Sequence, residues 1–179
     1  MSTLVLIDIQ KEYTTLGRPF YLNGIESSLN NARKLLKMAR AKKWDIVHVQ
    51  HFRKDGNGIF NRSEPQFSGF VDGFEPTSEE RYFEKHIFSC YSNPEFANFM
   101  EEKKNEPTYI IGYGTTKCVL STIIEGFHRG HHSLIVVEDA TYAKAELEQG
   151  FSEKDLHKAM IATIRSSYAK VQTTAELLT

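Results

Sequence analysis

The chain has 179 residues, of which 40% are hydrophobic and 25% are charged, and its formal net charge at pH 7 is −1. This balance is ordinary for a soluble globular protein, and the absence of a basic block argues against nucleic-acid binding. No apolar stretch approaches the roughly 18 residues that a membrane-spanning helix needs. We therefore expect a single domain over residues 1–179 with neither a nucleic-acid nor a membrane partner.

The two cysteines, Cys90 and Cys118, do not form a C-x-x-C pair. This usage argues against a disulfide framework and favours a reduced, cytoplasmic setting. The N-terminus enters an apolar run without the charged segment and cleavage site of a secretion signal, which agrees with a cytoplasmic location.

Short apolar runs alternate with helical periodicities from the N-terminus onward. The run Leu4–Ile7, followed by Asp8, is continuous rather than alternating, which is typical of a parallel strand buried on both faces. A helix is predicted over 23–43 with Asn23 as its N-cap, and a second strand over 45–50.

Residues 52–80 interrupt this alternation. This long loop contains glycines, prolines and five phenylalanines, namely Phe52, Phe60, Phe67, Phe70 and Phe74. An ordered loop rich in aromatic residues forms a lid or pocket wall, or else packs a subsidiary core or a subunit interface. Both interpretations are open from the sequence.

The second half of the chain returns to the alternating pattern. The predicted elements are a strand over 81–84, a helix over 93–104, a strand over 108–111, a helix from Thr115 or Thr116, a strand over 132–137, a helix from Ser152, a strand over 168–173 and a terminal helical turn over 174–178. This pattern predicts a three-layer αβα fold with a Rossmann-like, mostly parallel sheet of about six strands in the order 3-2-1-4-5-6 and helices on both faces.

Three chemically distinct side chains follow predicted strands. In parallel sheets, ligands bind outside the carboxyl ends of the strands, so Asp8, Lys85 and Cys118 are expected to meet at one rim. An Asp8–Lys85 ion pair satisfies two buried charges and, together with the first turn of a helix, favours a Cys118 thiolate. Taken singly, these residues are a turn aspartate, a surface lysine and a small buried cysteine, and Cys90 is assigned to packing.

The histidines and glycines do not indicate a cofactor. His51 lies at the end of a strand near the rim but has no carboxylate two residues before it, so we expect a substrate contact or a structural role rather than a metal site. Gly112 and Gly114 form only a fragment of a dinucleotide fingerprint, because Lys117 stands where the third glycine would be. We expect neither a metal nor an organic cofactor.

Four segments together resemble a known family. They are L-V-L-I-D-I-Q at Leu4–Gln10, E-K-H-I-F-S-C-Y at Glu84–Tyr91, I-I-G-Y-G-T-T-K-C-V-L-S-T at Ile110–Thr122 and V-V-E-D-A at Val136–Ala140. Their combination and order resemble the isochorismatase-like cysteine hydrolases, a group that includes nicotinamidases and other amidohydrolases. The resemblance covers nearly the whole chain but does not specify a substrate.

The resemblance implies a catalytic triad of Asp8, Lys85 and Cys118. It also implies a cis peptide bond between Tyr113 and Gly114, with the backbone N–H groups of Gly114 and Cys118 directed at the substrate oxygen. The Asp-x-His metal motif of nicotinamidases is absent here, which argues against nicotinamide. Isochorismatases that cleave a vinyl ether commonly lack the cysteine, so Cys118 favours amide chemistry.

The sequence hypothesis is therefore an amidohydrolase that cleaves a small carboxamide through a Cys118 thioester. Five residues are assigned to substrate binding: Tyr13, His51, Phe52, Tyr91 and Tyr113. Two alternatives remain open, a vinyl ether hydrolase that uses Asp8 as general acid, and a redox-sensing or binding protein with a reactive Cys118. Apolar helix faces and the phenylalanine-rich loop predict a homo-oligomer, either a dimer or a tetramer.

Overall fold

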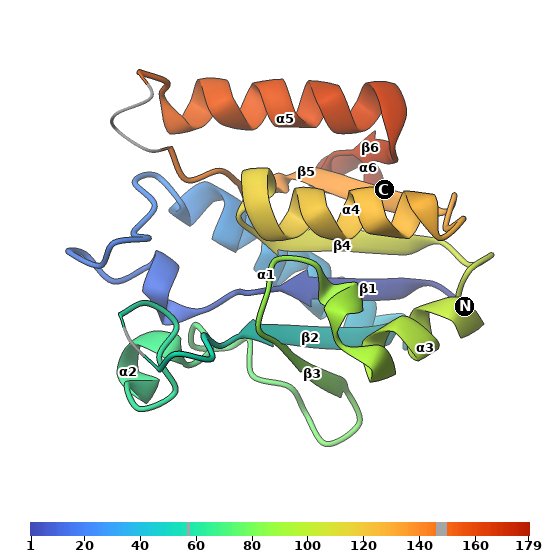
Figure 1. Ribbon diagram of the computed structural model, residues 1–179. Coiled ribbons are helices and arrows are strands. Elements are labelled where there is room, and N and C mark those ends of the chain that lie inside the picture. The colour runs from blue at the N-terminus through green and yellow to red at the C-terminus, as the bar shows by residue number, and fades with distance from the viewer. Residues whose placement is uncertain (57, 146–149) are drawn as a thin grey trace.

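The computed structural model describes residues 1–56, 58–145 and 150–179. These residues form a six-stranded sheet in the order β3-β2-β1-β4-β5-β6, and all neighbouring strands in it are parallel (Figure 1). The strands are β1 (Thr3–Ile7), β2 (Asp45–His51), β3 (Arg81–Lys85), β4 (Thr108–Tyr113), β5 (Leu134–Tyr142) and β6 (Lys170–Gln172). The strand order predicted from the sequence is confirmed.

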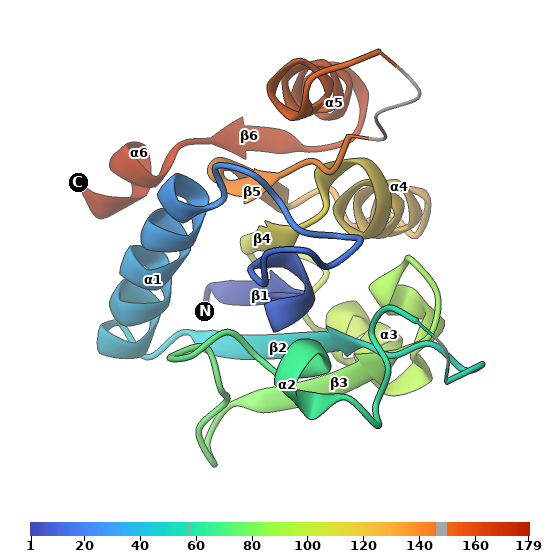
Figure 2. The ribbon, with the colours of Figure 1, turned by 90° about the vertical axis from the view of Figure 1, so that its left-hand side faces the viewer.

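Helices cover both faces of the sheet. They are α1 (Glu26–Ala41), α2 (Pro65–Ser68), α3 (Pro94–Glu102), α4 (Leu120–His128), α5 (Glu153–Ser167) and α6 (Thr174–Leu178). Helices α1 and α6 lie on one side of the sheet, and α3, α4 and α5 lie on the other (Figure 2). The protein is thus a three-layer αβα structure, as predicted. None of the described helices combines the length and apolar character needed to cross a bilayer.

Strand β1 explains why both faces must be covered. Leu4 and Leu6 pack into the core beneath α1, whereas Val5 and Ile7 pack into the core beneath α3, α4 and α5. All four side chains are at most 2% exposed. Because side chains alternate along a strand, a continuous apolar run buries itself only when both faces are covered.

Two predicted element boundaries are wrong. Helix α1 begins at Glu26 rather than after Asn23, because Gly24 has a φ of +81° that interrupts a helical path. Strand β5 does not end before Glu138 but continues to Tyr142. The register of β4 and β5 shifts between Ile110 and Gly112, so a bulge accommodates the polar residues within the strand.

The long loop at 52–80 packs against the body of the protein. Phe74 is fully buried and Phe60 is 4% exposed, and both belong to the core beneath α1. Phe70 forms an isolated bridge with Gln10, the residue pair that fixes the loop beside the end of β1. The loop is therefore partly core, as one of the two interpretations proposed, and it also reaches the cavity described below.

Candidate active site

Four neighbouring strands each deliver one side chain to the carboxyl edge of the sheet, which faces the viewer in Figure 2. Lys85 ends β3, His51 ends β2, Asp8 directly follows β1, and Cys118 lies in a π turn (Thr115–Val119) after β4. His51 and Lys85 are paired in the register of β2 and β3, so their side chains emerge side by side. The predicted meeting of Asp8, Lys85 and Cys118 is present in the structure, and His51 joins them.

Backbone geometry brings these ends together. Gly112 has a φ of +115°, and a Cβ atom there would lie 2.0 Å from the carbonyl oxygen of Ile7, so only glycine permits this approach of β4 to β1. The peptide bond between Tyr113 and Gly114 is cis, at the position that the family resemblance implies. Asp8 adopts a left-handed φ of +53°, a conformation that costs energy in a non-glycine residue and clusters at functional sites.

The ammonium group of Lys85 occupies the centre of the cluster. Its Nζ lies 2.7 Å from Asp8 Oδ2, 2.9 Å from His51 Nδ1 and 3.2 Å from Cys118 Sγ. The ammonium therefore forms an ion pair with Asp8 and donates hydrogen bonds to His51 and Cys118. The four side chains are between 0% and 8% exposed. We call Asp8, His51, Lys85 and Cys118 the rim cluster.

The charge state of the rim cluster follows from these contacts. Burial alone lowers the pKa of Lys85, but the charges of Asp8 and Cys118 raise it above its usual value, so the side chain stays an ammonium. Burial and the charge of Lys85 lower the pKa of His51 to about 3, so its ring is neutral. Because Lys85 only donates, His51 Nδ1 accepts the hydrogen bond.

The expectation of a low-pKa Cys118 thiolate is wrong. Burial raises the pKa of the Cys118 thiol well above its usual value, the Asp8 charge raises it further, and Lys85 offsets only part of this. Burial likewise raises the pKa of Asp8 against the opposing effect of Lys85. Burial thus disfavours the Cys118 thiolate, the Lys85 ammonium 2.7 Å from Asp8 favours the carboxylate, and Asp8 is placed to take the thiol proton.

A metal ion does not fit this site. Ligand atoms of Asp8, His51 and Cys118 lie within 4.8 Å of one another, which is a spacing that a divalent cation can use. However, the Lys85 ammonium already forms an ion pair with Asp8 and donates hydrogen bonds to His51 and Cys118. A cation at the same point would have to displace a buried positive charge.

A cavity of about 780 Å³ opens over Cys118. Its wall combines apolar side chains with a polar rim, and the lining residues are Tyr13, Phe20, His51, Arg53, Lys54, Asp55, Ile59, Phe60, His86, Ile87, Phe88, Lys117 and Cys118. Two of the five residues assigned to substrate binding, Tyr13 and His51, are therefore at the cavity.

The other three assigned residues do not line this cavity. The Tyr113 side chain is fully buried and contacts Ser28 Oγ at 2.9 Å, beneath α1. Tyr91 belongs to the core on the opposite face, with its ring 5.2 Å from Phe96. Phe52 is 7% exposed and lies beneath the guanidinium of Arg62. Successive side chains near the end of a strand point to opposite sides of the sheet. A residue that is close in sequence to the site can therefore point away from the cavity.

Several cavity residues were missed by sequence reasoning. Arg53 and Lys54 lie two and three residues after His51, at the end of β2. His86, Ile87 and Phe88 directly follow Lys85, and Lys117 directly precedes Cys118. The residues that line the site therefore include those within a few positions after the end of each strand. Phe20 and Ile59 come from loops, and no periodicity in the sequence marks them.

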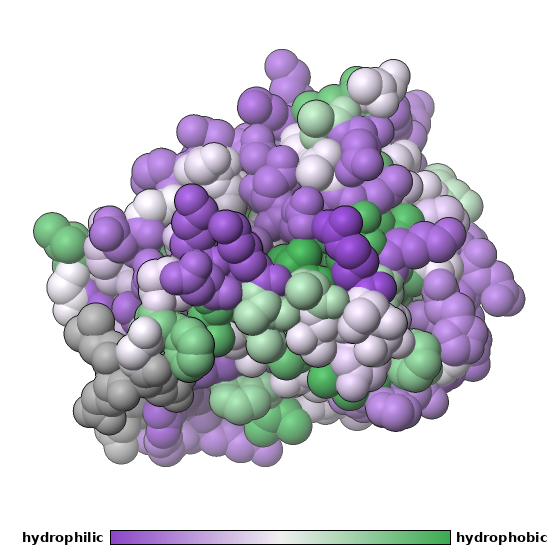
Figure 3. All heavy atoms as spheres, turned by 90° about the horizontal axis from the view of Figure 1, so that it is seen from above, coloured by the Kyte–Doolittle hydropathy of each residue, from purple (hydrophilic) through white to green (hydrophobic). Residues whose placement is uncertain are grey.

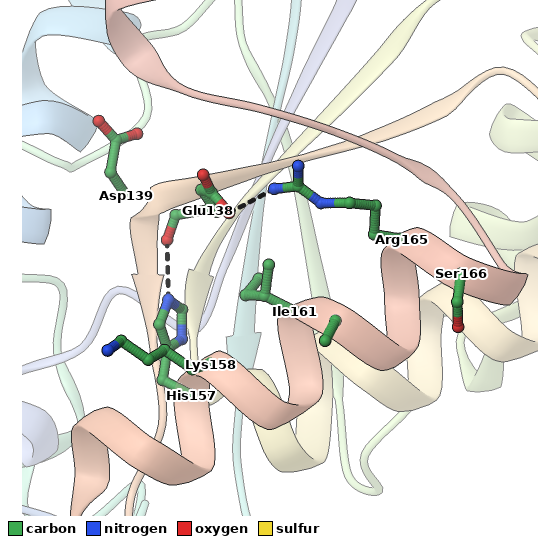
Figure 4. Close-up of a pocket in the computed structure, with 8 residues that line it drawn as sticks. Glu138, Asp139, His157, Lys158, Ile161, Arg165 and Ser166 are labelled. Atoms are coloured by element: carbon green, nitrogen blue, oxygen red, sulfur yellow. Dashed lines mark hydrogen bonds and ion pairs between the residues drawn. The ribbon is translucent and has the colours of Figure 1, made fainter.

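A hydrogen-bonded chain connects the π turn to α5. His157 Nε2 lies 3.0 Å from the carbonyl oxygen of Glu138, which only accepts (Figure 4). On the other side of the ring, His157 Nδ1 lies 3.0 Å from Thr115 Oγ1. Burial lowers the pKa of His157, so the neutral ring donates from Nε2 and accepts from the Thr115 hydroxyl. Thr115 is fully buried and begins the turn that carries Cys118.

The same histidine borders a second cavity of about 640 Å³ between α5 and β5. Figure 4 shows Ile161 on its wall and Arg165 paired with Glu138 at its edge. Seen from the side of α5, apolar atoms are exposed between strongly polar ones (Figure 3). The Ser166 hydroxyl on its wall donates to the Thr163 carbonyl oxygen and contacts the Ser167 hydroxyl rather than a base, so the rim cluster is the stronger candidate for chemistry.

Comparison with known proteins shows the family to which the chain belongs. Residues 2–176 match the Isochorismatase domain family. Maleamate amidohydrolase from Pseudomonas putida is 25% identical over 185 residues, covering 95% of this chain and 82% of the relative. Ureidoacrylate amidohydrolase from Acinetobacter baylyi is 22% identical over 205 residues, covering 97% and 80%.

Solved structures show the same fold. The structure of a putative isochorismatase from Burkholderia xenovorans superimposes with a TM-score of 0.87 at 26% identity, covering 98% of this chain and 85% of the other. The family match spans nearly the whole chain, and relatives along that length include amidohydrolases. The protein therefore belongs to the isochorismatase family and is a hydrolase.

Proposed function

We propose that this hydrolase cleaves the C–N bond of a small carboxamide through a thioester on Cys118. The observation that carries the proposal is the position of the Lys85 ammonium, within 2.7 Å of Asp8 Oδ2 and 3.2 Å of Cys118 Sγ. This arrangement joins a nucleophile, a base and a fixed positive charge in a buried site, which is the requirement for covalent catalysis.

In the first half of the reaction, the Asp8 carboxylate takes the proton of the Cys118 thiol. The sulfur then attacks the amide carbonyl carbon, a C–S bond forms, and the carbonyl π electrons move to oxygen. The N–H groups of Gly114 and Cys118 stabilise that oxyanion, each by roughly 3 kcal/mol as in comparable sites. Lys85 offsets the negative charge while the proton is on Asp8.

In the second half, the C–N bond breaks as the protonated Asp8 donates its proton to the departing amine. Water then enters, Asp8 removes one of its protons, and the hydroxyl oxygen bonds to the thioester carbon. The C–S bond breaks, and Asp8 returns the proton to sulfur. The products are a carboxylic acid and an amine or ammonia, and the site returns to a thiol and a carboxylate.

The cavity and the relatives support a small amide as substrate. Maleamate amidohydrolase and ureidoacrylate amidohydrolase are named for small amides. The space of about 780 Å³ over Cys118 is ample for molecules of that size. Tyr13 and His51 line this cavity together with Cys118, and we assign them to contacts with the acyl part of the substrate.

Ammonia release over a panel of small carboxamides tests the proposal. We expect wild type to release ammonia from at least one amide and Cys118→Ala to release none. If Cys118→Ala matches wild type on every substrate that is turned over, covalent catalysis is wrong. A vinyl ether hydrolase would instead retain activity in Cys118→Ala and lose it in Asp8→Asn.

The redox-sensing alternative receives less support from the structure. A sensor cysteine is exposed and has a low pKa. Cys118 is 4% exposed, and burial and Asp8 raise its pKa. A thiol in this state is suited to activation by a neighbouring base upon substrate binding.

A further inference from the structure

His51 has a defined tautomer because of its neighbour. Its Nδ1 atom lies 2.9 Å from Lys85 Nζ, and an ammonium can only donate. Nδ1 therefore carries no hydrogen, and the single hydrogen of the neutral ring is on Nε2. The ring presents an N–H donor on the edge that faces away from Lys85.

The direction of this donor is fixed by packing. The side chain of Gln10 binds both backbone polar groups of His51, accepting from its N–H at 2.9 Å and donating to its carbonyl at 3.1 Å. The ring also packs against Phe60, with 5.1 Å between ring centroids. A donor held at both the backbone and the ring loses little entropy when it binds an acceptor.

The Nε2–H group faces the cavity. In the part of the chain that the structure describes, Nε2 makes no hydrogen bond, yet it is not among the buried polar atoms that lack a partner. It is therefore accessible, and the surface to which it is accessible is the cavity over Cys118, which His51 lines. In the empty cavity water satisfies this donor, and a bound substrate must replace that water.

Building on the proposed amidohydrolase function, we infer that His51 selects substrates with a hydrogen-bond acceptor oxygen close to the scissile amide. One of the two nitrogens of the His51 ring lies within 4.8 Å of both the Cys118 sulfur and an Asp8 oxygen. Nε2 belongs to the same ring, so the acceptor belongs within a few bonds of the carbonyl carbon. Because the donor is neutral, a carboxylate, a ketone or a ureido carbonyl can serve.

The Nε2–H donor favours substrates with an acceptor because binding of a substrate without one costs free energy. His51 is only 8% exposed, so a substrate without the acceptor displaces water from the Nε2–H group and leaves this donor unpaired. Sites built to hydrogen-bond a substrate group reject analogues that lack it more strongly than apolar pockets reject a missing methylene. We expect a preference in kcat/KM of about 10- to 100-fold.

Two amides of nearly equal shape test this inference. They are 4-oxopentanamide, which carries a ketone oxygen, and 4-methylpentanamide, which carries a methyl group at the same place. Wild type should favour the ketone by the factor given above. His51→Phe keeps a ring without a donor and should reduce the preference to near unity, whereas His51→Gln keeps a donor and should retain part of it.

His86 provides a matched control. It also lines the cavity, but its Nδ1 is held 2.8 Å from the carbonyl oxygen of Phe52. His86→Phe should therefore preserve the ratio between the two amides. Loss of the ratio in His86→Phe with retention in His51→Phe would overturn the assignment to His51.

Nitrogen NMR tests the tautomer directly. Between about pH 5 and 8, His51 should show a protonated Nε2 and a bare Nδ1, and Lys85→Met should abolish this pattern. The opposite tautomer in wild type overturns the inference. If ammonia release depends on Cys118 but shows no preference for the ketone, the inference fails and the proposed function stands. If no ammonia release depends on Cys118, both fail.

Discussion

Strand β2 contributes a histidine to each of two charged clusters, and the clusters differ in how fully their carboxylate is hydrogen-bonded. His51 belongs to the rim cluster. His48, earlier on the same strand, belongs to a cluster with Glu80 and Arg40. In the second cluster every oxygen of the Glu80 carboxylate accepts hydrogen bonds: from Arg40 Nε at 2.6 Å and Nη2 at 2.9 Å, from His48 Nε2 at 2.9 Å and from the Thr77 N–H at 3.0 Å.

The carboxylate of the rim cluster is less completely satisfied. Among the described residues, neither oxygen of the buried Asp8 carboxylate has a hydrogen-bond partner of regular geometry, and Oδ2 is held by the ion pair with Lys85 at 2.7 Å. An unpaired buried carboxylate oxygen is costly and is retained where chemistry requires a free acceptor. The comparison indicates that the Glu80 cluster stabilises the fold, whereas the rim cluster holds reactive groups in place.

Asp8→Asn should give the largest effect on activity. Amide turnover should fall by about 10⁴-fold, because the variant can neither take the thiol proton nor protonate the leaving amine. The same change should lower the pKa of Cys118, since the Asp8 charge raises it and Lys85 lowers it. Faster alkylation of Cys118 by iodoacetamide at neutral pH, with turnover lost, is the expected pair of results.

Glu80→Gln is the matched control for that experiment and should leave the alkylation rate unchanged. An Asp8→Asn enzyme that keeps turnover within about tenfold of wild type would contradict the role given to Asp8 as base.

Lys85→Met should give the next largest effect. Methionine fills similar space but leaves the Asp8 carboxylate without a counter-charge, so Asp8 should take up a proton and cease to act as base. We expect turnover to fall by about 10³-fold and the free energy of unfolding to fall by about 3 kcal/mol. Ammonia release and urea unfolding measure the two quantities. A variant with unchanged turnover would remove Lys85 from the mechanism.

Glu80→Gln should separate stability from activity. The Glu80 side chain is 6% exposed, and its neutralisation weakens charge-assisted hydrogen bonds to Arg40 and His48. The free energy of unfolding should fall by about 2 kcal/mol, while kcat/KM of the folded enzyme stays within about twofold. A selective loss of kcat/KM with unchanged stability would reverse the comparison between the two clusters.

The same residue should also make stability depend on pH. Burial raises the pKa of Glu80, but hydrogen bonds from Arg40 and Thr77 and the charge of His48 lower it to about 2. A depressed carboxyl pKa stabilises the folded state above the unfolded pKa of about 4.5 and loses that contribution as pH falls toward 2. Urea unfolding between pH 5 and 3 should show a steeper loss in wild type than in Glu80→Gln, and parallel losses would contradict this.

Among the changes expected to reduce turnover, removal of the contact between Thr115 and His157 should give the smallest loss. This contact is satisfied, like the Glu80 cluster, yet it holds the turn that carries Cys118. Thr115→Val keeps the shape but removes the hydroxyl, and we expect kcat to fall about tenfold with little change in KM. Thr115→Ser restores a hydroxyl and should recover most of kcat. Equal losses in both variants would assign the effect to packing rather than to the hydrogen bond.

The sequence predicted the placement of the site better than its electrostatics. A continuous apolar run identified β1, and alternation of strands and helices predicted the sheet order and hence the meeting of Asp8, Lys85 and Cys118. The sign of the Cys118 pKa shift depends on how deeply the thiol is buried beside Asp8, and no pattern in the sequence records burial depth.

Side-chain direction in the loops was also not predictable. Tyr91 and Phe52 lie close in sequence to Lys85 and His51, yet their rings point into packed regions rather than into the cavity. Phe20 reaches the cavity from a loop without any periodic signal. Tertiary packing decides such directions, and a strand or helix period carries information only within regular elements.

Mass spectrometry of the reaction stopped during turnover tests the central claim most directly. With an amide that wild type hydrolyses, we predict that the peptide containing Cys118 gains the mass of the acyl group and that Cys118→Ala gains no mass and releases no ammonia. Ammonia release by Cys118→Ala at the wild-type rate, with no acyl group on Cys118 in the wild type, would contradict the account.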